Sequence, residues 1–330
     1  IPGGIDGGWY QLYFTSPINT TDPSRFTGAP LENALVKVID GAQQKIDMAV
    51  FEFNSQPVTD ALLRAKQQRN VQIRVVTDGD HGLESPTSTL DQLETAGIPI
   101  KSDGTRGALM HNKFFVIDGL YVWTGSTNIT VNDIYNNNNS SIFIRSSQLA
   151  QDYTDEFNEL FAGQFGITSP NTVANPSINN NGTQIETLFE AEGNVPARIV
   201  QLVNNSSSIR FMAFSLTRYD IMNAMLARMQ AGADVVGIVE ASSRRFAAPL
   251  FCGGVDIKQD GNPDVLHHKI FIFNGQTVVI GSFNFSDSAA NQNDENTLII
   301  TNPDIAQAYL QEFERRWAEA QTVPLSNFGC

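Results

Sequence analysis

Cysteine, histidine, basic residues and long apolar runs are all scarce in this 330-residue sequence. The two cysteines, Cys252 and Cys330, are too few for a disulfide framework and too far apart in sequence for a thiolate zinc cluster. They either form one disulfide or remain free thiols. With 21 Lys and Arg against 35 Asp and Glu, the net charge of −14 argues against a protein that coats DNA. No apolar run approaches the roughly 20 residues that cross a bilayer, which argues against a membrane-embedded enzyme.

What the sequence does contain is an internal repeat, which is the signature of a duplicated architecture. Apolar residues make up 41% of the chain, enough for a substantial core. In both halves, β-rich segments alternate with segments of helical periodicity, which predicts βαβ units and an α/β fold with mixed, mostly parallel sheets. The first half has predicted helices at 31–42 and 57–69 and strands at 45–53 and 71–77; the second has helices at 195–203 and 220–230 and strands at 208–216 and 235–240.

A segment rich in Asn, Pro and Gly separates the two halves. This composition predicts an irregular surface connection. We therefore expect an N-terminal lobe at residues 1–163, a linker at 164–183 and a C-terminal lobe at 184–330.

The most informative residues occupy matching positions in the two halves. The first half reads H-N-K-F-F-V-I-D from His111 and G-S-T-N from Gly125; the second reads H-H-K-I-F-I-F-N from His267 and G-S-F-N from Gly281. All spacings agree. Chance explains one H-x-K, but it does not explain two in the same extended frame of a chain with four histidines. His268 lies out of register, since only His267 is two residues before Lys269.

The residue types in these motifs suit phosphate chemistry. Side chains two apart on a strand project from one face, so each His and Lys pair lies on one surface. A lysine binds phosphate as a compact charge, and imidazole acts as a nucleophile or proton donor near neutral pH. Two facing sets can attack a phosphate from one side and protonate the leaving oxygen on the other.

With its paired H-x-K-x4-D and G-S-x-N motifs, the sequence resembles the phospholipase D superfamily over nearly its whole length. The resemblance implies a pseudo-twofold pair of α/β/α sandwich lobes with one active site between them. It also implies two-step phosphodiester exchange through a covalent phosphohistidine, with no cofactor and no catalytic metal. Asp118 completes the first motif, and Asn274 replaces the usual Asp in the second. We expect both to be structural, in the turn after the catalytic strand.

A further pair of positions distinguishes the two halves. Twenty-eight residues after each motif histidine stand Asn139 in the first half and Glu295 in the second. A carboxylate bonded to Nδ1 of an imidazole fixes the tautomer that leaves Nε2 free and stabilises the positive charge that develops. In families of this kind the acid of one lobe supports the histidine of the other. We therefore expect Glu295 to support His111 as the nucleophile and Asn139 to orient His267 as general acid and then base.

The motifs and their surroundings give a list of candidate site residues. We expect catalytic roles for His111, Lys113, His267, Lys269, Glu295, Asn128 and Asn284, and substrate contacts from Ser126, Ser282, Asn139, Trp123, Phe283 and Arg106. Tyr121, Tyr135, Arg244 and Arg245 are weaker candidates, because core packing is the better explanation for each tyrosine and solvation the usual one for an arginine. His81, beside Asp78 and Asp80, is interpreted as a loop residue.

The sequence leaves two enzyme substrates and one binding role open. The motif context resembles that of small nucleases of the superfamily, which favours DNA, single- or double-stranded. A secreted phospholipase D acting on glycerophospholipids is the alternative, and the acidic charge favours it. A binding protein with a dead site is disfavoured because both histidines and both lysines are present. Because one chain supplies both half-sites, a monomer suffices. The chain begins with Ile1 rather than Met, so we expect a mature secreted form.

Overall fold

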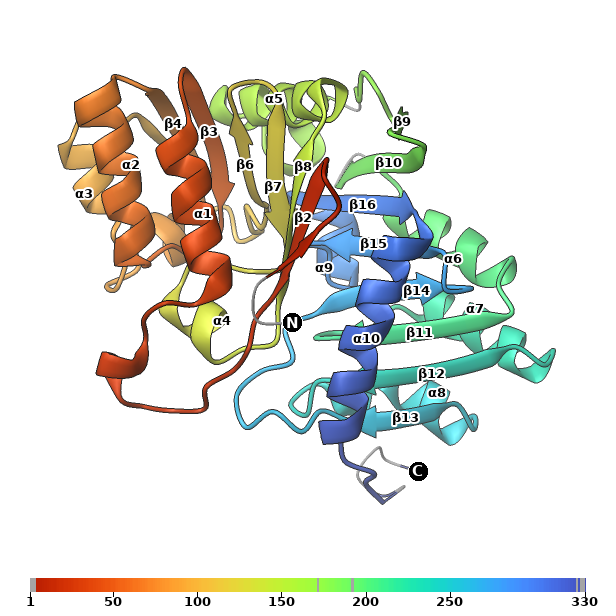
Figure 1. Ribbon diagram of the computed structural model, residues 1–330. Helices are drawn as coiled ribbons and strands as arrows, with labels where there is room; N and C mark the ends of the chain where they lie inside the picture. The colour runs from red at the N-terminus through yellow and green to blue at the C-terminus, as the bar shows by residue number, and fades with distance from the viewer. Residues whose placement is uncertain (1–3, 171, 191–192, 325, 327–329) are drawn as a thin grey trace.

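The computed structural model describes residues 4–170, 172–190, 193–324, 326 and 330. Each half of the chain contributes an eight-stranded sheet to this structure (Figure 1). The strand order is β1-β2-β8-β7-β6-β3-β4-β5 in the first sheet and β13-β12-β11-β14-β15-β16-β10-β9 in the second. The repeat in the sequence is therefore a repeat in the structure, and the expected two-lobed α/β fold is confirmed.

The bounds of the elements follow in chain order. The first sheet contains β1 (Ile5–Asp6), β2 (Tyr10–Phe14), β3 (Lys45–Val50), β4 (Gln72–Thr77), β5 (Ile100–Ser102), β6 (Lys113–Ile117), β7 (Tyr121–Gly125) and β8 (Ser140–Arg145). The second contains β9 (Ser177–Asn180), β10 (Thr183–Glu190), β11 (Ser208–Ala213), β12 (Asp234–Val239), β13 (Asp256–Gln259), β14 (Lys269–Phe273), β15 (Thr277–Gly281) and β16 (Glu295–Thr301). The α-helices are α1 (Pro30–Gly41), α2 (Gln56–Arg69), α3 (Leu90–Thr95), α4 (Val131–Tyr135), α5 (Ser147–Phe161), α6 (Val195–Asn204), α7 (Tyr219–Gln230), α8 (Ala248–Cys252), α9 (Asp287–Asn291) and α10 (Pro303–Glu319).

The sheets are mixed, as expected, but the expectation that they are mostly parallel is wrong. Among the described residues, the parallel pairs are β3–β4 and β4–β5 in the first sheet and β11–β12 and β12–β13 in the second. The other five neighbouring pairs of each sheet are antiparallel. The reason lies in the connections. Helices α2, α3, α7 and α8 carry the chain across between the parallel strands, whereas tight turns join β6 to β7 and β14 to β15, and the short helices α4 and α9 lie in the loops that return to the antiparallel strands β8 and β16.

These tight turns are encoded by Asp118-Gly119 and Asn274-Gly275. All four residues have positive φ, from 53° to 62°. Asp-Gly and Asn-Gly adopt this backbone readily and are strong hairpin signals. Leu120 N–H closes the first turn on the carbonyl of Ile117 at 3.1 Å. The strand that carries each H-x-K lysine therefore folds straight back into its antiparallel neighbour.

Helices cover both faces of each sheet, and the inner ones join the lobes. The outer helices are α1, α2 and α3 on the first sheet and α6, α7 and α8 on the second (Figure 1). Helices α5 and α10 belong to a core cluster that includes residues of both sheets. Tyr153 of α5 packs edge to face on Phe189 of the other lobe, and Tyr309 of α10 packs in the same way on Phe14, each pair with ring centroids 5.1 Å apart. Burying apolar surface from both lobes in one core holds them in a fixed relation.

The segment 164–183, which we expected to be irregular, contains a strand. Ser177–Asn180 forms β9 and pairs with β10 through a hairpin. The turn is Asn181-Gly182, with φ of 52° and 84°. An Asn-Gly pair between short strands is a hairpin signal that the composition of the segment obscured. The exact lobe boundaries stay a prediction.

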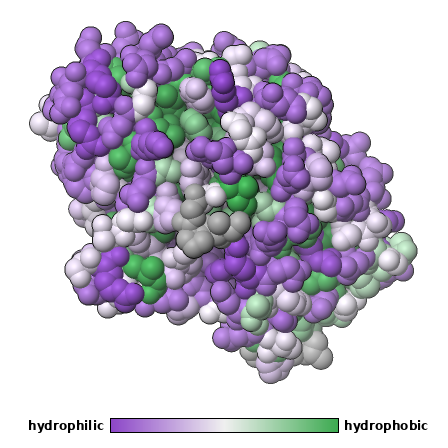
Figure 2. All heavy atoms as spheres, in the orientation of Figure 1, coloured by the Kyte–Doolittle hydropathy of each residue, from purple (hydrophilic) through white to green (hydrophobic). Residues whose placement is uncertain are grey.

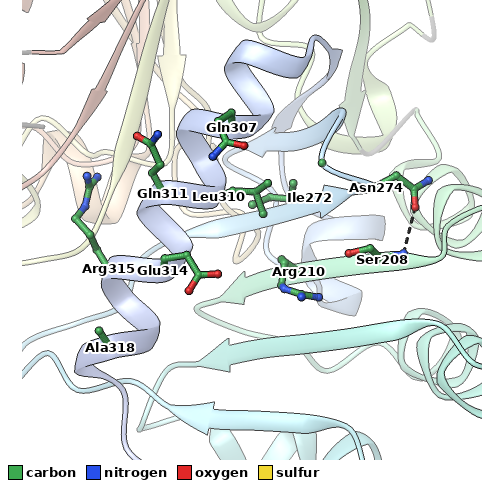
Figure 3. Close-up of a pocket in the computed structure, with 11 residues that line it drawn as sticks. Ser208, Arg210, Ile272, Asn274, Gln307, Leu310, Gln311, Glu314, Arg315 and Ala318 are labelled. Carbon is green, nitrogen blue, oxygen red and sulfur yellow. Dashed lines mark hydrogen bonds between the residues drawn. The ribbon is translucent and has the colours of Figure 1, made fainter.

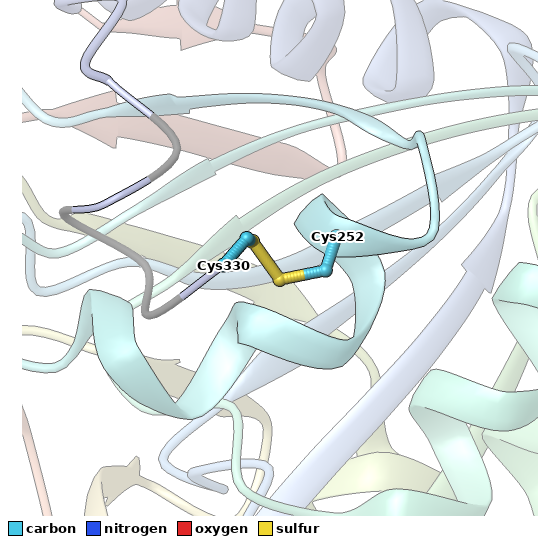
Figure 4. The surroundings of a disulfide bond; sticks show 2 residues. All are labelled: Cys252 and Cys330. Carbon is cyan, nitrogen blue, oxygen red and sulfur yellow. A yellow bond between two sulfur atoms is a disulfide. The ribbon is translucent and has the colours of Figure 1, made fainter.

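The two cysteines form a disulfide. Cys252, the last residue of α8, bonds Cys330, with Cα atoms 5.8 Å apart (Figure 4). This settles the alternative that the sequence left open.

The described helices do not include one that is both long and apolar enough to cross a membrane. On the face seen in Figure 2, apolar residues form small groups among hydrophilic side chains.

Candidate active site

The two lobes exchange backbone hydrogen bonds next to the motif histidines. His111 N–H donates to the carbonyl of Asp294 at 3.0 Å, and Asp294 N–H donates to Leu109 at 2.9 Å. In the mirrored arrangement, His267 N–H donates to Asn138 at 3.0 Å, and Asn138 N–H donates to Val265 at 2.8 Å. Asp294 immediately precedes Glu295, and Asn138 immediately precedes Asn139. This pairing brings Glu295 to His111 and Asn139 to His267.

A carboxylate holds the His111 ring. Nδ1 of His111 lies 2.8 Å from Oε2 of Glu295, across the lobe interface. The same oxygen accepts the Ser282 hydroxyl at 2.5 Å, and Oε1 accepts the Asn293 amide at 3.1 Å. Because an ionised carboxylate only accepts hydrogen bonds, Nδ1 carries the proton and Nε2 is left for substrate.

An amide holds the His267 ring in the mirrored way. Nδ1 of His267 lies 2.9 Å from Oδ1 of Asn139. The Ser126 hydroxyl donates to the same amide oxygen at 2.8 Å. Nδ2 of Asn139 donates to the carbonyl of Asp133 at 3.1 Å and to its Oδ1 at 3.2 Å. The amide is therefore oriented with its oxygen toward the ring.

The motif lysines are buried beside their histidines. Lys113 Nζ donates to the carbonyl of His111 at 2.8 Å, and Lys269 Nζ donates to that of His267 at 2.9 Å. Each ammonium lies about 5 Å from the ring centre of a phenylalanine, Phe51 in one lobe and Phe214 in the other. Burial lowers the pKa of Lys113 to about 8, with nearby carboxylates opposing the effect. Burial and the charge of Lys113 lower the pKa of Lys269 to about 7.

Both motif histidines and Glu295 have shifted pKa values. Burial lowers the pKa of His111, although the charge of Glu295 opposes this effect. Burial alone would raise the pKa of Glu295, but the charge and hydrogen bond of His111 hold it below its ordinary value. Burial and the charge of Lys269 lower the pKa of His267 well below its ordinary value. Shifts of this kind are common at catalytic sites.

A cavity of about 320 Å³ opens beside these groups. Its lining includes Glu52, His81, Asn128, Asn137, His267 and Phe214. A larger cavity of about 880 Å³ lies between α10 and strands β11 and β14 (Figure 3). The lining of this larger cavity contains the turn residue Asn274 but none of the motif histidines and lysines. The chemistry therefore belongs to the smaller cavity.

Asp118 and Asn274 lie in the turns after β6 and β14, where we expected them. The carboxylate of Asp118 accepts the backbone N–H groups of Gln43, Gln44 and Lys45 at 2.8–2.9 Å. Oδ1 of Asn274 accepts the N–H groups of Ser207 and Ser208 at 2.9 and 3.1 Å. An amide oxygen replaces a carboxylate here because the turn requires an acceptor rather than a charge.

The expectation that Trp123 and Phe283 contact substrate is wrong. Each side chain is 2% exposed and belongs to the core of its lobe. Trp123 stacks on Tyr13 at 5.6 Å, and Phe283 packs beside Phe285. Both side chains therefore pack in the cores beneath the outer helices of their lobes rather than into the site.

Arg106 is also not available to substrate. Its guanidinium bonds the carboxylates of Asp103 and Asp294 and the carbonyl of Gln292. It lies above the ring of Phe165 at 5.4 Å. Because Asp294 and Gln292 come from the second half of the chain, Arg106 is a clamp between the lobes.

Ser126, Ser282 and Asn139 contact the site from within. The two hydroxyls donate to Asn139 and Glu295, and all three side chains are buried. They therefore position the groups behind the histidines and do not reach a substrate. Asn128 lines the cavity and donates to Glu52 at 3.3 Å, and Asn284 is half-buried.

The weaker candidates separate by position. Tyr121 stacks on Phe143 at 5.1 Å, and the hydroxyl of buried Tyr135 donates to Glu32 at 2.5 Å. Arg244 bonds the carbonyl of Ala241, and Arg245 is exposed. His81, which we interpreted as a loop residue, lines the cavity, and its ring lies 4.8 Å from that of Phe51.

Two acidic residues of the site were missed. Glu52 follows β3 and lines the cavity, and burial together with the charge of Asp133 raises its pKa. Asp133, in α4, lies behind Asn139. Neither residue is part of a repeated motif, since the corresponding positions of the second lobe hold Ser215 and Ala289. The only signal in the sequence was this difference between the halves. The described residues do not include a group of three His, Cys, Asp or Glu side chains placed to hold a metal ion.

Comparison with known proteins agrees with this geometry. A family model described as "Cardiolipin synthase, PLD-like domain" matches residues 35–161 and 199–317. The chain belongs to this phospholipase D-like family. The resemblance drawn from the motifs is therefore confirmed.

Individual relatives match part of the chain. A mitochondrial cardiolipin hydrolase of Xenopus laevis is 34% identical over 139 residues, which are 42% of this chain and 64% of that protein. A phospholipase D of Rickettsia prowazekii (strain Madrid E) is 34% identical over 119 residues, 36% of this chain and 57% of that protein. The chain thus spans a little over half the length of these relatives. The crystal structure of phosphatidylserine synthase from Haemophilus influenzae Rd KW20 shares the fold, with a TM-score of 0.72, 13% identity, and coverage of 97% of this chain and 89% of that one.

Proposed function

We propose that this protein is a phosphodiesterase that works through a covalent phosphohistidine on His111 and needs no metal ion. The observation that carries the proposal is the pair of buried histidines, each held at Nδ1 by the opposite lobe, so that both Nε2 atoms are left for a phosphate. Lys113 and Lys269 supply positive charge beside them.

In the first step, Nε2 of His111 attacks phosphorus, and the bond from phosphorus to one ester oxygen breaks. His267 donates its Nε2 proton to that oxygen, so the alcohol leaves neutral. Glu295 stabilises the positive charge that develops on His111, because it lies 2.8 Å from Nδ1. The lysines hold the non-bridging oxygens.

In the second step, water attacks the phosphohistidine. His267, now neutral, takes a proton from the water, and the bond between phosphorus and nitrogen breaks. The products are a phosphomonoester and the free enzyme. The same histidine thus serves as acid and then as base, which returns the site to its starting protonation state.

We propose a phospholipid as the substrate. The names of the two relatives, cardiolipin hydrolase and phospholipase D, support this choice. So does the cavity, because Glu52 and Asp133 line it and repel the neighbouring phosphates of a polynucleotide. The nuclease predicted from the motif context stays a prediction and forms the other arm of the test.

The substrate is tested by incubating the protein in excess EDTA with phosphatidylcholine vesicles, cardiolipin vesicles, single-stranded DNA and double-stranded DNA. We expect phosphatidic acid from at least one lipid, intact DNA, and no product with His111→Ala. Degraded DNA with intact lipid would establish the nuclease instead. Activity that EDTA abolishes and Mg²⁺ or Zn²⁺ restores would contradict the metal-free mechanism.

We also propose that the protein is secreted or otherwise works in an oxidising compartment. The bond between Cys252 and Cys330 supports this, because disulfides persist in such compartments. Thiol alkylation of protein taken from its native source, followed by mass spectrometry, tests it. Alkylated cysteines without prior reduction would contradict the proposal.

A further inference from the structure

The two lobes provide a carboxylate for each histidine in different ways. In the second lobe, Glu295 contacts His111 directly, and Ala289 stands six residues before it. In the first lobe, Asn139 contacts His267, and Asp133 stands at the position of Ala289. One lobe therefore has Glu with Ala, and the other has Asn with Asp. In the first lobe, the Asn139 side chain therefore lies between the carboxylate of Asp133 and the imidazole of His267.

The position of the Asp133 side chain is well defined. Oδ1 accepts the amides of Asn139 at 3.2 Å and Asn137 at 2.5 Å, and it lies 3.6 Å from Nδ1 of His267. Oδ2 accepts the N–H of Asn128 at 2.9 Å. The side chain is almost fully buried, so solvent does not screen its charge strongly.

We propose that Asp133 is a positioning residue that supplies, through the Asn139 amide, the negative charge that His267 needs to carry a proton to the leaving alcohol. The inference rests on the proposed function, because it assigns His267 the role of general acid. An amide alone orients the ring but compensates no charge. With Asp133 behind it, the second histidine has the same net counter-charge as the first.

The surroundings of His267 explain why a counter-charge is needed. Burial and the charges of Lys269, Lys113, His111 and His268 all lower its pKa. Lys113 and Lys269 begin β6 and β14, and His111 and His268 lie in the segments that lead into these two strands. Glu52, after β3, is the other acid near this side, and its own pKa is raised partly by Asp133. Without Asp133, a buried imidazole would have to hold its proton among cations, which is costly.

A purely structural role is the competing explanation. The backbone carbonyl of Asp133 also accepts the Asn139 amide, at 3.1 Å, and Oδ2 ties down Asn128. Removing the side chain could therefore disturb the loop without any electrostatic effect. The test therefore has to relocate the negative charge from position 133 while the protein stays folded. The second lobe provides the pattern, because its carboxylate, Glu295, contacts the histidine directly.

The decisive variants are Asp133→Ala, Asp133→Asn and the double variant Asp133→Ala with Asn139→Glu. The double variant recreates in the first lobe the Glu and Ala arrangement that the second lobe already has. The chain contains four histidines, so a spectrum of labelled imidazoles has few resonances. The resonance that disappears in His267→Asn is that of His267. Thermal denaturation identifies the variants that fold.

Nuclear magnetic resonance titration of His267 gives a readout that does not depend on activity. We expect its pKa to fall by about 1 pH unit or more in Asp133→Ala and Asp133→Asn, and to recover in the double variant. The pKa of His111 should change less, because Glu295 remains. If Asp133→Ala fails to fold, Asp133→Asn and the double variant decide the question. An unchanged pKa of His267 in a folded variant would overturn the inference.

Kinetics then link the charge to proton donation. Loss of Asp133 should lower kcat/KM for an alkyl ester such as dihexanoyl phosphatidylcholine by about 10-fold or more and move its alkaline limb to lower pH. For an aryl phosphodiester, whose leaving group needs no proton, kcat/KM should fall far less. The double variant should restore kcat/KM for the alkyl ester. Equal losses on both esters, with no movement of the limb, would contradict the inference. A wild-type protein that cleaves neither ester contradicts the proposed function, while the titration still decides the role of Asp133.

Discussion

At the scale of the residue, Asn274 illustrates how little of a side chain a structural role requires. Asp118 and Asn274 both sit at a positive φ and both accept backbone N–H groups through a side-chain oxygen. Asn and Asp are the non-glycine residues that tolerate this conformation best. The loss of the charge at position 274 therefore leaves the turn intact.

Replacing Asn274 tests this account. Asn274→Ala removes the acceptor of two N–H groups and strains the turn, so it should lower the free energy of unfolding by about 1–3 kcal/mol. Asn274→Asp keeps both features and should change it by less than about 0.5 kcal/mol. Urea denaturation measures both values. An Asn274→Asp variant as destabilised as Asn274→Ala would mean that the amide nitrogen, rather than the oxygen, is the important group.

The buried lysines predict how substrate affinity depends on pH. Lys113 and Lys269, with pKa values of about 8 and about 7, are charged at acidic pH and lose their charge as the pH rises through these values. The attraction for a phosphodiester is therefore present at low pH and lost at high pH. KM measured between pH 6 and 9 should rise with pH, most steeply above pH 7. A KM that is constant or falls over this range would contradict the account.

At the scale of the element, the exchanged segments around the histidines hold the site together. Residues 109–111 pair with Asp294, and Asn138 pairs with residues 265–267. Arg106 stabilises the first of these pairings between lobes by bonding Asp294, which is 1% exposed. The catalytic geometry thus depends on contacts between lobes that each lobe alone does not provide.

Arg106→Ala should act on stability rather than on substrate binding. It removes the guanidinium bonds to the buried Asp103 and Asp294 carboxylates, which should cost about 2–4 kcal/mol. KM should change by less than about 3-fold, since the guanidinium faces the protein. Denaturation and steady-state kinetics on the same variant separate the two effects. A large rise in KM with unchanged stability would instead support the contact between Arg106 and substrate that the sequence predicted.

The sequence predicted the elements and the motif residues well, for identifiable reasons. The helices and strands of both βαβ units have strong periodicity, and the H-x-K and G-S-x-N residues recur at fixed spacing. The antiparallel strands were missed because a strand's direction depends on its connection, and the Asp118-Gly119 turn was interpreted only as part of a motif. Trp123 was misplaced because both faces of β7 are buried, so alternation does not tell which face meets the site, and Phe283 was misplaced because it follows β15 in a loop whose direction alternation does not predict. Asp133 and Glu52 were missed because they belong to one lobe only.

At the scale of the whole molecule, the disulfide ties the C-terminal end of the chain to the second lobe. Cys252 and Cys330 are 78 residues apart in sequence, and neither lines the cavity that Asn128 and His267 line. A crosslink over a loop of this length restricts the unfolded chain considerably. The bond should therefore contribute to stability and not to catalysis.

Reduction of this bond gives a direct test. Dithiothreitol, or the double variant Cys252→Ser with Cys330→Ser, should lower the free energy of unfolding by about 2–4 kcal/mol. Activity at 25 °C should stay within about 2-fold of the oxidised protein. Differential scanning calorimetry and an activity assay measure the two quantities. Loss of activity without loss of stability would show that the bond shapes the site.

The central claim is that His111 carries the phosphate while His267 moves protons. An aryl phosphodiester tests it best, because its leaving group departs without a general acid, so His267→Ala should still form the covalent intermediate and fail to hydrolyse it. Mass spectrometry at neutral pH or above should then find one phosphorylated peptide, with the phosphate on His111, and none in His111→Ala. Phosphate on His267 would reverse the two roles, and turnover by His111→Ala would contradict the phosphohistidine mechanism altogether.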